Sequence, residues 1–342
     1  MKTLLALLLL IPSLSYSKNP PQKFLNDQYI FKYHEFIDWP ENTKLFGKIE
    51  THGRISQNSW NLRYETKIVR DGKYSLRFEM RDGDCGSDDC PRKNKSGRSE
   101  VSFSGEIPSN QAKGHAGEVW YAWSIYLPED TNSIYPAYTI LGQFKMYNEY
   151  LEINKNRFGA RSSDDENCPE IPILFYFNKA GITFVNDGVT ECDSHFSKTI
   201  LSSKNIHNKW HDILMHVNWT DKETGFTKIW VNGQLVIDKE GKTINKIVKN
   251  NKGKIHGPSF RFGIYNGGRY EPVNTQIAYY DAFKASNNCE DVSQFYDCEM
   301  IKESKLEDPK EQLLKELDFD INSKKIIHRL KRVYLNTNSS IV

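Results

Sequence analysis

Three segments alternate polar and apolar residues in a way that would bring reactive side chains to one face of a β-sheet. The polar positions are Arg98, Glu100 and Ser102 in residues 97–103, Gln143, Lys145 and Tyr147 in residues 141–147, and Arg261 and Tyr265 in residues 260–265. Because side chains alternate along a strand, these polar residues share one face of each strand and their apolar neighbours lie on the other face. Guanidinium groups bind anions in pairs of hydrogen bonds, and a phenol or a desolvated amine can transfer a proton. The segments predict a polar cleft on a sheet.

Gly263 lies between Arg261 and Tyr265 in the third segment. A glycine inside a strand often marks the close approach of a ligand or another backbone, so we expect a ligand to approach there. Each residue alone has a plainer explanation. Arg98 and Glu100 can form a simple ion pair across a sheet, and Tyr265 can be an aromatic residue at the end of a strand. For the whole set together, we favour a polar ligand-binding cleft on the sheet.

Short β-strands are the elements that must position these residues. Between residues 68 and 283, alternating apolar and polar runs are separated by turns rich in glycine, asparagine, aspartate and proline. Asn232-Gly233 between two such runs is a strong hairpin signal. Further alternating runs cover residues 74–81, 119–127, 173–177, 213–219 and 277–283. This spacing predicts an all-β sandwich.

The first 17 residues have the layout of a signal peptide. A positive start is followed by an apolar run from Thr3 to Ile11 and then by small residues up to Ser17. That run is too short to span a bilayer, and no later stretch is long enough. We therefore expect a secreted or periplasmic protein with no membrane partner, and a monomer.

The composition bounds the partners of the chain. Its 46 lysines and arginines nearly balance its 44 aspartates and glutamates, so no global field favours nucleic acid. Any preference for an acidic ligand must come from a local arrangement. Aromatic residues make up 13% of the chain, which suits both β-strands and surfaces that stack sugars.

The six cysteines fall into pairs that are close in sequence. In an exported chain, this spacing predicts three local disulfides. A zinc site is the weaker interpretation because the usual ligand spacings are missing. Asp82, Asp84, Asp88 and Asp89 could bind calcium, although a solvated acidic loop is favoured. Otherwise no cofactor or metal is expected. The predicted pairs are Cys85 with Cys90, Cys168 with Cys192, and Cys289 with Cys298.

The character of the chain changes after Asn287. Asp308-Pro309 is a typical helix start, and residues 324–335 carry an apolar stripe among basic residues. The sequence is thus divided into a signal peptide (1–17), a β-domain (18–287) and a disulfide-stapled helical tail (288–342). The tail could pack on the sandwich, dimerise or touch a surface; we favour packing or a loose appendage.

Several motifs occur in an order that resembles a known group of enzymes. Arg98-Ser-Glu is followed by Gly142-Gln-Phe-Lys and Phe262-Gly-Ile-Tyr, with residues 120–128 and 229–233 in between. From about Gly72 to Phe283 the chain resembles the β-jelly-roll polysaccharide lyases, which include the heparin lyase I, glucuronan lyase and alginate lyase families. The resemblance implies a concanavalin A-like β-jelly-roll sandwich with a short C-terminal helical tail.

The same resemblance implies roles for residues of the cleft. Its motifs carry an arginine and a glutamate on one strand, a glutamine on a second and a tyrosine on a third. Many relatives have histidine at the position of Lys145 and lysine at that of Arg261, which leaves the base open between Tyr265 and Lys145. The implied catalytic residues are Arg98, Gln143, Lys145 and Tyr265, and the substrate-binding candidates are Glu100, Tyr147, Arg261 and Arg269.

A lyase of this kind would cleave an acidic, uronate-containing polysaccharide by β-elimination. Arg98 and Gln143 would hold the uronate carboxylate. Phenols are poor bases at neutral pH because their ordinary pKa is about 10, but adjacent cations stabilise phenolate. We expect Arg261 to be that cation beside Tyr265. The alternatives are a non-catalytic, lectin-like module and, ranked last, a glycoside hydrolase, which needs two suitably spaced carboxylates.

Overall fold

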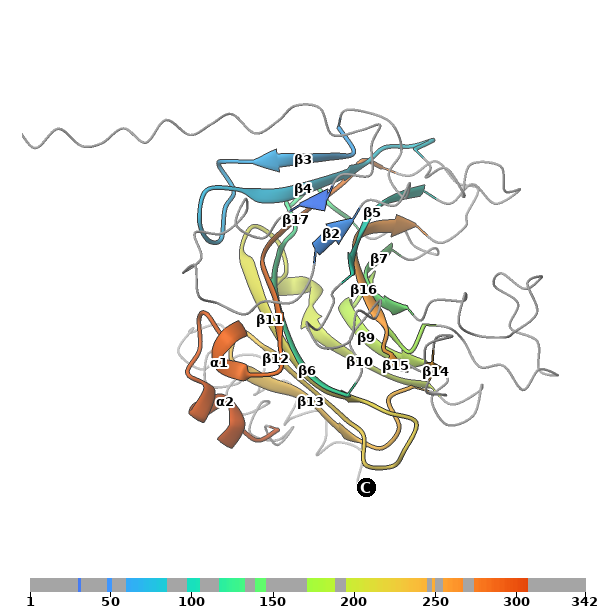
Figure 1. Cartoon of the computed structure of the whole chain (residues 1–342). Helices are drawn as coiled ribbons and strands as arrows, with labels where there is room; N and C mark the ends of the chain where they lie inside the picture. Colours follow the sequence, from blue (N-terminus) through green and yellow to red (C-terminus); the bar gives the residue numbers. More distant parts are fainter. Residues whose placement is uncertain are drawn as a thin grey trace, which may run out of the picture.

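The computed structural model describes residues 30–31, 48–50, 60–84, 97–104, 117–132, 139–145, 171–187, 195–244, 248–249, 255–266 and 274–306. Within this part of the chain, two antiparallel sheets stack into a sandwich (Figure 1). This arrangement confirms the predicted all-β jelly roll. None of the helices in the described ranges is long and apolar enough to cross a membrane.

Eight strands form the sheet that carries the predicted cleft, here called sheet A. Its central strands come from distant parts of the sequence, so the cleft residues meet only once the sheet has formed. In spatial order the strands are β1 (Ile30–Phe31), β2 (Lys48–Glu50), β5 (Gly97–Ser104), β16 (Ser259–Asn266), β7 (Thr139–Lys145), β8 (Ile173–Asn178), β9 (Gly181–Asp187) and β10 (His195–Ser202).

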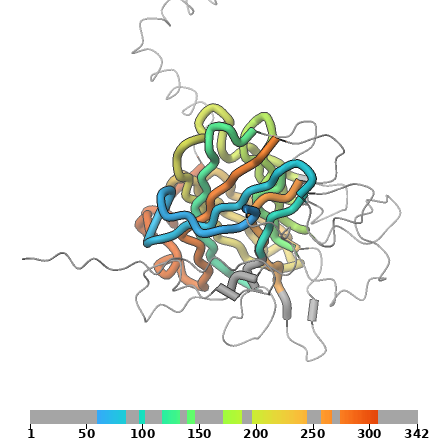
Figure 2. Tube along the Cα trace, turned by 90° about the horizontal axis from the view of Figure 1, so that it is seen from above, coloured from blue at the N-terminus to red at the C-terminus, as the bar shows by residue number. Residues whose placement is uncertain are grey.

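Seven strands form the opposite sheet, sheet B. In Figure 1 its β3 and β4 lie at the top, and in Figure 2, seen from above, they are nearest the viewer. A separate pair, β14 (Val248–Lys249) and β15 (Ile255–His256), forms a small hairpin. The strands of sheet B are β13 (Gln234–Glu240), β12 (Phe226–Val231), β11 (Trp210–Trp219), β6 (Gly117–Tyr126), β17 (Gln276–Ser286), β4 (Ser75–Met80) and β3 (Leu62–Glu65).

One apolar core fills the space between the sheets. Alternate residues of each strand enter it, as the period of two requires. In β16, Phe260, Phe262 and Ile264 are all buried in this core, which leaves the residues between them for the outer face of sheet A. Trp123 of sheet B packs against Phe260 with ring centroids 4.8 Å apart. Removing such an aromatic side chain would cost about 3–5 kcal/mol, so the core holds the strands of the cleft firmly in place.

The predicted hairpin at Asn232-Gly233 is present between β12 and β13. Both turn residues have positive φ, 51° and 81°, as a two-residue turn of this kind requires. A β-carbon at Gly233 would lie only 2.8 Å from the ring of Tyr296. The glycine therefore serves the turn and also admits a residue of the C-terminal segment.

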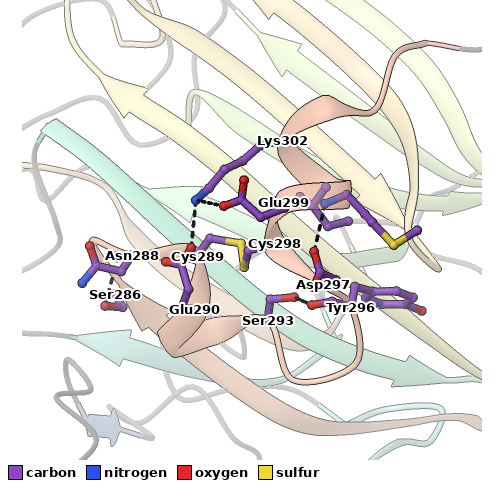
Figure 3. The surroundings of a disulfide bond; sticks show 12 residues. Ser286, Asn288, Cys289, Glu290, Ser293, Tyr296, Asp297, Cys298, Glu299 and Lys302 are labelled. Carbon is purple, nitrogen blue, oxygen red and sulfur yellow. Dashed lines mark hydrogen bonds and ion pairs between the residues drawn. A yellow bond between two sulfur atoms is a disulfide. The ribbon is translucent and has the colours of Figure 1, made fainter.

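The C-terminal segment packs on the outer face of sheet B. It contains α1 (Cys289–Val292) and α2 (Cys298–Glu303), which are joined by the disulfide Cys289–Cys298 (Figure 3). This is one of the three predicted disulfides; the other two pairs lie outside the described residues, as do the helices expected beyond residue 308. The segment buries a second apolar cluster that includes Trp120, Leu214, Trp230, Leu235, Val292 and Ile301. Of the options left open for the tail, residues 289–303 adopt packing against the sandwich.

The carboxylate of Asp212 anchors this cap to the sheet. Arg70 donates two hydrogen bonds to it at 2.9 Å, Ser124 donates one at 2.7 Å, and Tyr296 donates one at 2.9 Å. Burial by itself raises the pKa of Asp212, but the hydrogen bonds from Arg70 and Ser124 outweigh it and hold the pKa below its ordinary value. The folded state therefore favours the ionised carboxylate.

We expect Asp212→Asn to destabilise the protein at pH 7 by about 1–3 kcal/mol, because bonds to a buried charge are lost. A carboxyl group whose pKa is lowered in the folded state stabilises the protein at pH values above its ordinary pKa of about 3.9. This stabilisation is lost as the pH falls through the lowered pKa of the folded state. The gap between wild type and variant in free energy of unfolding should therefore narrow below about pH 4. Urea titrations from pH 7 to pH 3 measure it.

The matched control is Asp238→Asn. Asp238 pairs with Lys228 at 3.2 Å, but both side chains are about one-third exposed. Exposed ion pairs contribute about 0–1 kcal/mol, so this variant should differ little from wild type at any pH. Equal losses in the two variants, or a gap for Asp212→Asn that stays constant down to pH 3, would contradict the proposed anchor.

Candidate active site

Three adjacent strands of sheet A bring the predicted cleft residues together. In the register of β16 with β5, Tyr265 lies opposite Arg98 and Gly263 opposite Glu100. In the register of β16 with β7, Arg261 lies opposite Gln143. Directly opposed residues share a sheet face, and the core residues of β16 point the other way. The expectation that these residues meet on one face is confirmed, while their chemical roles stay predictions.

Glu100 lies at the centre of the group. Gln143 donates a short hydrogen bond from Nε2 to Oε1 of Glu100, and Arg98 donates one from Nη1 to Oε2 at 3.1 Å. Only 1% of Glu100 and 1% of Gln143 are exposed. Because an ionised carboxylate only accepts hydrogen bonds, the amide nitrogen of Gln143 must face it. Glu100 thus fixes the orientation of both residues that were expected to hold a carboxylate.

Arg98 also stacks on the ring of Tyr265. The guanidinium carbon lies 3.8 Å from the ring centroid, well inside cation–π range. The sequence had suggested Arg261 as the cation beside Tyr265. In the structure Arg98 occupies that position, and Arg261 lies farther along β16, opposite Gln143. The difference arises because a cross-strand neighbour is closer than a residue four positions along the same strand.

The described side chains of β5, β7 and β16 include three cations and a single carboxylate. The cations are Arg98, Lys145 and Arg261, and the carboxylate is Glu100. This balance suits an anionic ligand. These strands therefore lack, in their described side chains, the second carboxylate that a glycoside hydrolase would need.

Lys145 ends β7 and lies opposite Ser259 of β16. It is two residues from Gln143, so it shares the outer face, and it is partly exposed. Tyr147 and Arg269, the two remaining substrate-binding candidates, lie outside the described residues. The side chain of Ser102 does too.

The structure explains the glycine at position 263 differently from the sequence-based expectation. Its φ of +134° is strained for any other residue, and an added β-carbon would meet the carbonyl oxygen of Ser99 at 2.2 Å and the ring of Phe78 at 2.9 Å. The missing side chain therefore makes room for the protein's own backbone and core. The expectation that it opens a path for a ligand is wrong, because periodicity alone did not reveal the irregular strand pairing here.

Gly263→Ala should lower the free energy of unfolding by at least about 2 kcal/mol, because overpacking costs about 1–3 kcal/mol and positive φ about 1–2 kcal/mol. Denaturant titration measures the loss. The control is Gly83→Ala, since Gly83 also has positive φ, +83°, but nothing lies within 4 Å of an added β-carbon. The control should lose only the strain term, about 1–2 kcal/mol. Equal losses would contradict the close contact described for Gly263.

An apolar patch that sequence reasoning missed lies beside the polar group. Tyr265 and Tyr176 pack against a small buried cluster, separate from the main core, on the outer face of sheet A. Such a patch next to hydrogen-bonding groups is typical of a surface that holds a sugar ring. The sequence contains a signal for this patch. Leu174 is apolar but lies between two core residues of β8, so its side chain must face away from the main core. The cluster consists of Ile140, Leu174 and Val185.

Two of the four aspartates that could bind calcium, Asp82 and Asp84, lie in the described residues. Asp84 is buried, and its Oδ2 accepts hydrogen bonds from Trp60, Asn61 and the backbone of Arg81. Asp88 and Asp89 lie outside the described residues. Elsewhere in the described part of the chain, no group of three or more histidine, cysteine or acidic residues gathers as a metal site would require. Asp84 serves as a structural acceptor in the turn that follows β4.

The chain is similar to known proteins. The family model described as polysaccharide lyase matches residues 41–284. No curated protein sequence matches the chain. Similar solved structures include the endo-β-1,4-glucuronan lyase of the fungus Trichoderma reesei, with 16% identity over 73% of this chain and 98% of that chain and a TM-score of 0.49. They also include an alginate lyase from Aplysia kurodai, with 15% identity, coverages of 67% and 87%, and a TM-score of 0.39.

Proposed function

Because the chain belongs to the polysaccharide lyase family, we propose that it cleaves an acidic, uronate-containing polysaccharide by β-elimination. The observation that carries this proposal is the linked group of Arg98, Glu100 and Gln143 beside Tyr265. It combines donors for a carboxylate with a group that can move a proton. The excess of positive charge among the described side chains of these strands suits an acidic polymer better than a neutral one.

The first step is capture of the uronate carboxylate. Arg98 donates to Glu100 from Nη1, and a guanidinium carries five N–H donors in a planar fork whose geometry matches a carboxylate. The amide of Gln143 likewise has a second N–H beyond the one given to Glu100. Together they would neutralise the charge that develops on the carboxylate when the neighbouring carbon loses its proton. Glu100 is thereby assigned a positioning role, acting through Arg98 and Gln143.

The second step is proton transfer. The C–H bond beside the carboxylate breaks, a carbon–carbon double bond forms, and the bond to the glycosidic oxygen breaks as that oxygen gains a proton. Tyr265 is the first candidate for the base, because the Arg98 cation on its ring favours a developing negative charge. It could return the same proton to the leaving oxygen. Lys145 is the second candidate.

We also propose that the protein acts outside the cytoplasm, since its first 17 residues read as a signal peptide. Many acidic polysaccharides are too large to cross a membrane, so a lyase that degrades them must be exported. N-terminal sequencing of the protein recovered from the native source would test export. A mature chain that begins near Lys18 is expected, and an intact Met1 would contradict it.

The direct test is the formation of an unsaturated uronate, which absorbs in the ultraviolet. The purified protein would be mixed with heparin, alginate and glucuronan, together with a neutral glucan as the control. We expect absorbance to rise with at least one acidic polymer and not with the neutral one. Binding to an acidic polymer without any unsaturated product would favour the lectin-like alternative. New reducing ends without absorbance would indicate hydrolysis.

A further inference from the structure

A buried tyrosine of the opposite sheet reaches across the core to the two strands that carry the site. Tyr280 belongs to β17 of sheet B, and only 2% of it is exposed. Its hydroxyl lies 2.7 Å from the carbonyl oxygen of Leu141 in β7 and 2.9 Å from that of Gly263 in β16. Leu141 is two residues before Gln143, and Gly263 is two residues before Tyr265.

The pairing of β7 with β16 is irregular at this point. Phe262 pairs with Gly142, but the next paired residue, Tyr265, lies opposite Ile140. Two residues of β16, Gly263 and Ile264, therefore face one residue of β7, which is the pattern of a β-bulge. A bulge interrupts the ladder hydrogen bonds, and buried carbonyls need a donor. The single O–H of Tyr280 is this donor, and the carbonyl groups of the two strands share it.

Burial raises the pKa of Tyr280 well above its ordinary value, and the negative charge of Glu100 raises it further. The hydroxyl therefore keeps its proton and remains a hydrogen-bond donor at any pH at which the activity would be assayed. Its ring is held by Phe78 and Phe262, with centroids 5.3 Å and 5.2 Å away. The donor is thus rigid as well as permanent.

We propose that Tyr280 is a positioning residue for the reaction, an inference that rests on the proposed function. Its hydroxyl fixes the offset between β7 and β16, and this offset sets where Tyr265 stands relative to Gln143. Tyr280 itself is buried beneath the sheet and does not touch substrate. Misplacement of a reacting group by about 1 Å can cost about a hundredfold in rate, so a weak link at this bulge would appear in kcat.

The test compares Tyr280→Phe with Tyr121→Phe. Tyr121 is also fully buried in the same core, and its hydroxyl accepts a hydrogen bond from Trp219 within sheet B. Both variants lose one buried hydroxyl and keep their ring. We expect similar drops in Tm, but a loss of about ten- to a hundredfold in kcat, with KM nearly unchanged, only for Tyr280→Phe. Activity is measured well below both melting temperatures.

Hydrogen exchange gives a readout that does not depend on activity. In Tyr280→Phe, the amides of residues 139–145 and 259–266 should exchange faster than in Tyr121→Phe. Equal exchange in the two variants, or a kcat for Tyr280→Phe within twofold of that of Tyr121→Phe, would overturn the proposal. If the wild type yields no unsaturated product from any acidic polymer, the proposed function fails. The exchange comparison then still decides whether Tyr280 fixes the two strands.

Discussion

Tyr265→Phe should reduce the rate of product formation by about a hundredfold to ten-thousandfold, the usual contribution of a general acid or base. The affinity for an acidic oligosaccharide should change by less than about tenfold, since the hydroxyl contributes at most one ordinary hydrogen bond to the ground state. The ring remains and can still stack under Arg98. Ultraviolet absorbance measures the rate, and calorimetry measures the affinity.

Tyr126→Phe is the matched control for this substitution. Tyr126 is a partly exposed tyrosine of β6, on the outer face of sheet B and thus on the opposite side of the sandwich, where it packs against Trp210 and Tyr279. Its loss of a hydroxyl should leave the rate unchanged. If Tyr265→Phe keeps the full wild-type rate, Tyr265 has no part in proton transfer. Lys145 then becomes the base to test, with Lys145→Met as the variant.

Much of the sandwich could be predicted because its strands carry a period of two in their own sequence. In β4, β6 and β11 every second residue enters the core, and Asn232-Gly233 is a direct sequence signal for its turn. The strands at the far edge of sheet A were not predicted. β10 (His195–Ser202) shows why: most of its described side chains are exposed, so no apolar row marks one of its faces.

The C-terminal cap shows a second limit of sequence reasoning. The close pair of cysteines predicted the staple, but α1 and α2 are too short to produce a helical repeat of apolar residues. Their anchor, the bond from Tyr296 to Asp212, joins residues 84 positions apart. Such a contact depends on the folded sheet and has no local sequence pattern.

The candidate site was predictable to the level of residues but not of contacts. Alternation placed Arg98, Gln143 and Tyr265 on the correct faces of their strands. It could not give the order β5, β16, β7, which makes Arg98 the neighbour of Tyr265. Nor could it find the bulge at Gly263, because the core row of β16 continues through it without a break. Sheet order and register are set by long-range packing.

Arg98→Ala should weaken both binding and catalysis, unlike Tyr265→Phe. Arg98 holds Glu100, stacks on Tyr265, and is proposed to bind the uronate carboxylate. A hydrogen bond to a charged group contributes about 1.5–3 kcal/mol, which corresponds to about ten- to a hundredfold in affinity. The rate at saturation should fall as well, since the same charge stabilises the transition state. Affinity is best measured in the Tyr265→Phe background, where the ligand is not cleaved.

Arg98→Lys and Arg63→Ala complete the test. Lysine keeps the charge but lacks the planar fork and stacks poorly on a ring, so Arg98→Lys should recover only part of the lost affinity and little of the rate. Arg63 is an exposed arginine of β3 in sheet B, and removing it should change neither quantity. A full recovery by lysine would mean that charge alone matters at this position. An Arg98→Ala variant with wild-type affinity would instead show that the carboxylate binds elsewhere on sheet A. Arg261 and Lys145, the other cations among the described side chains of β5, β7 and β16, would be tested next.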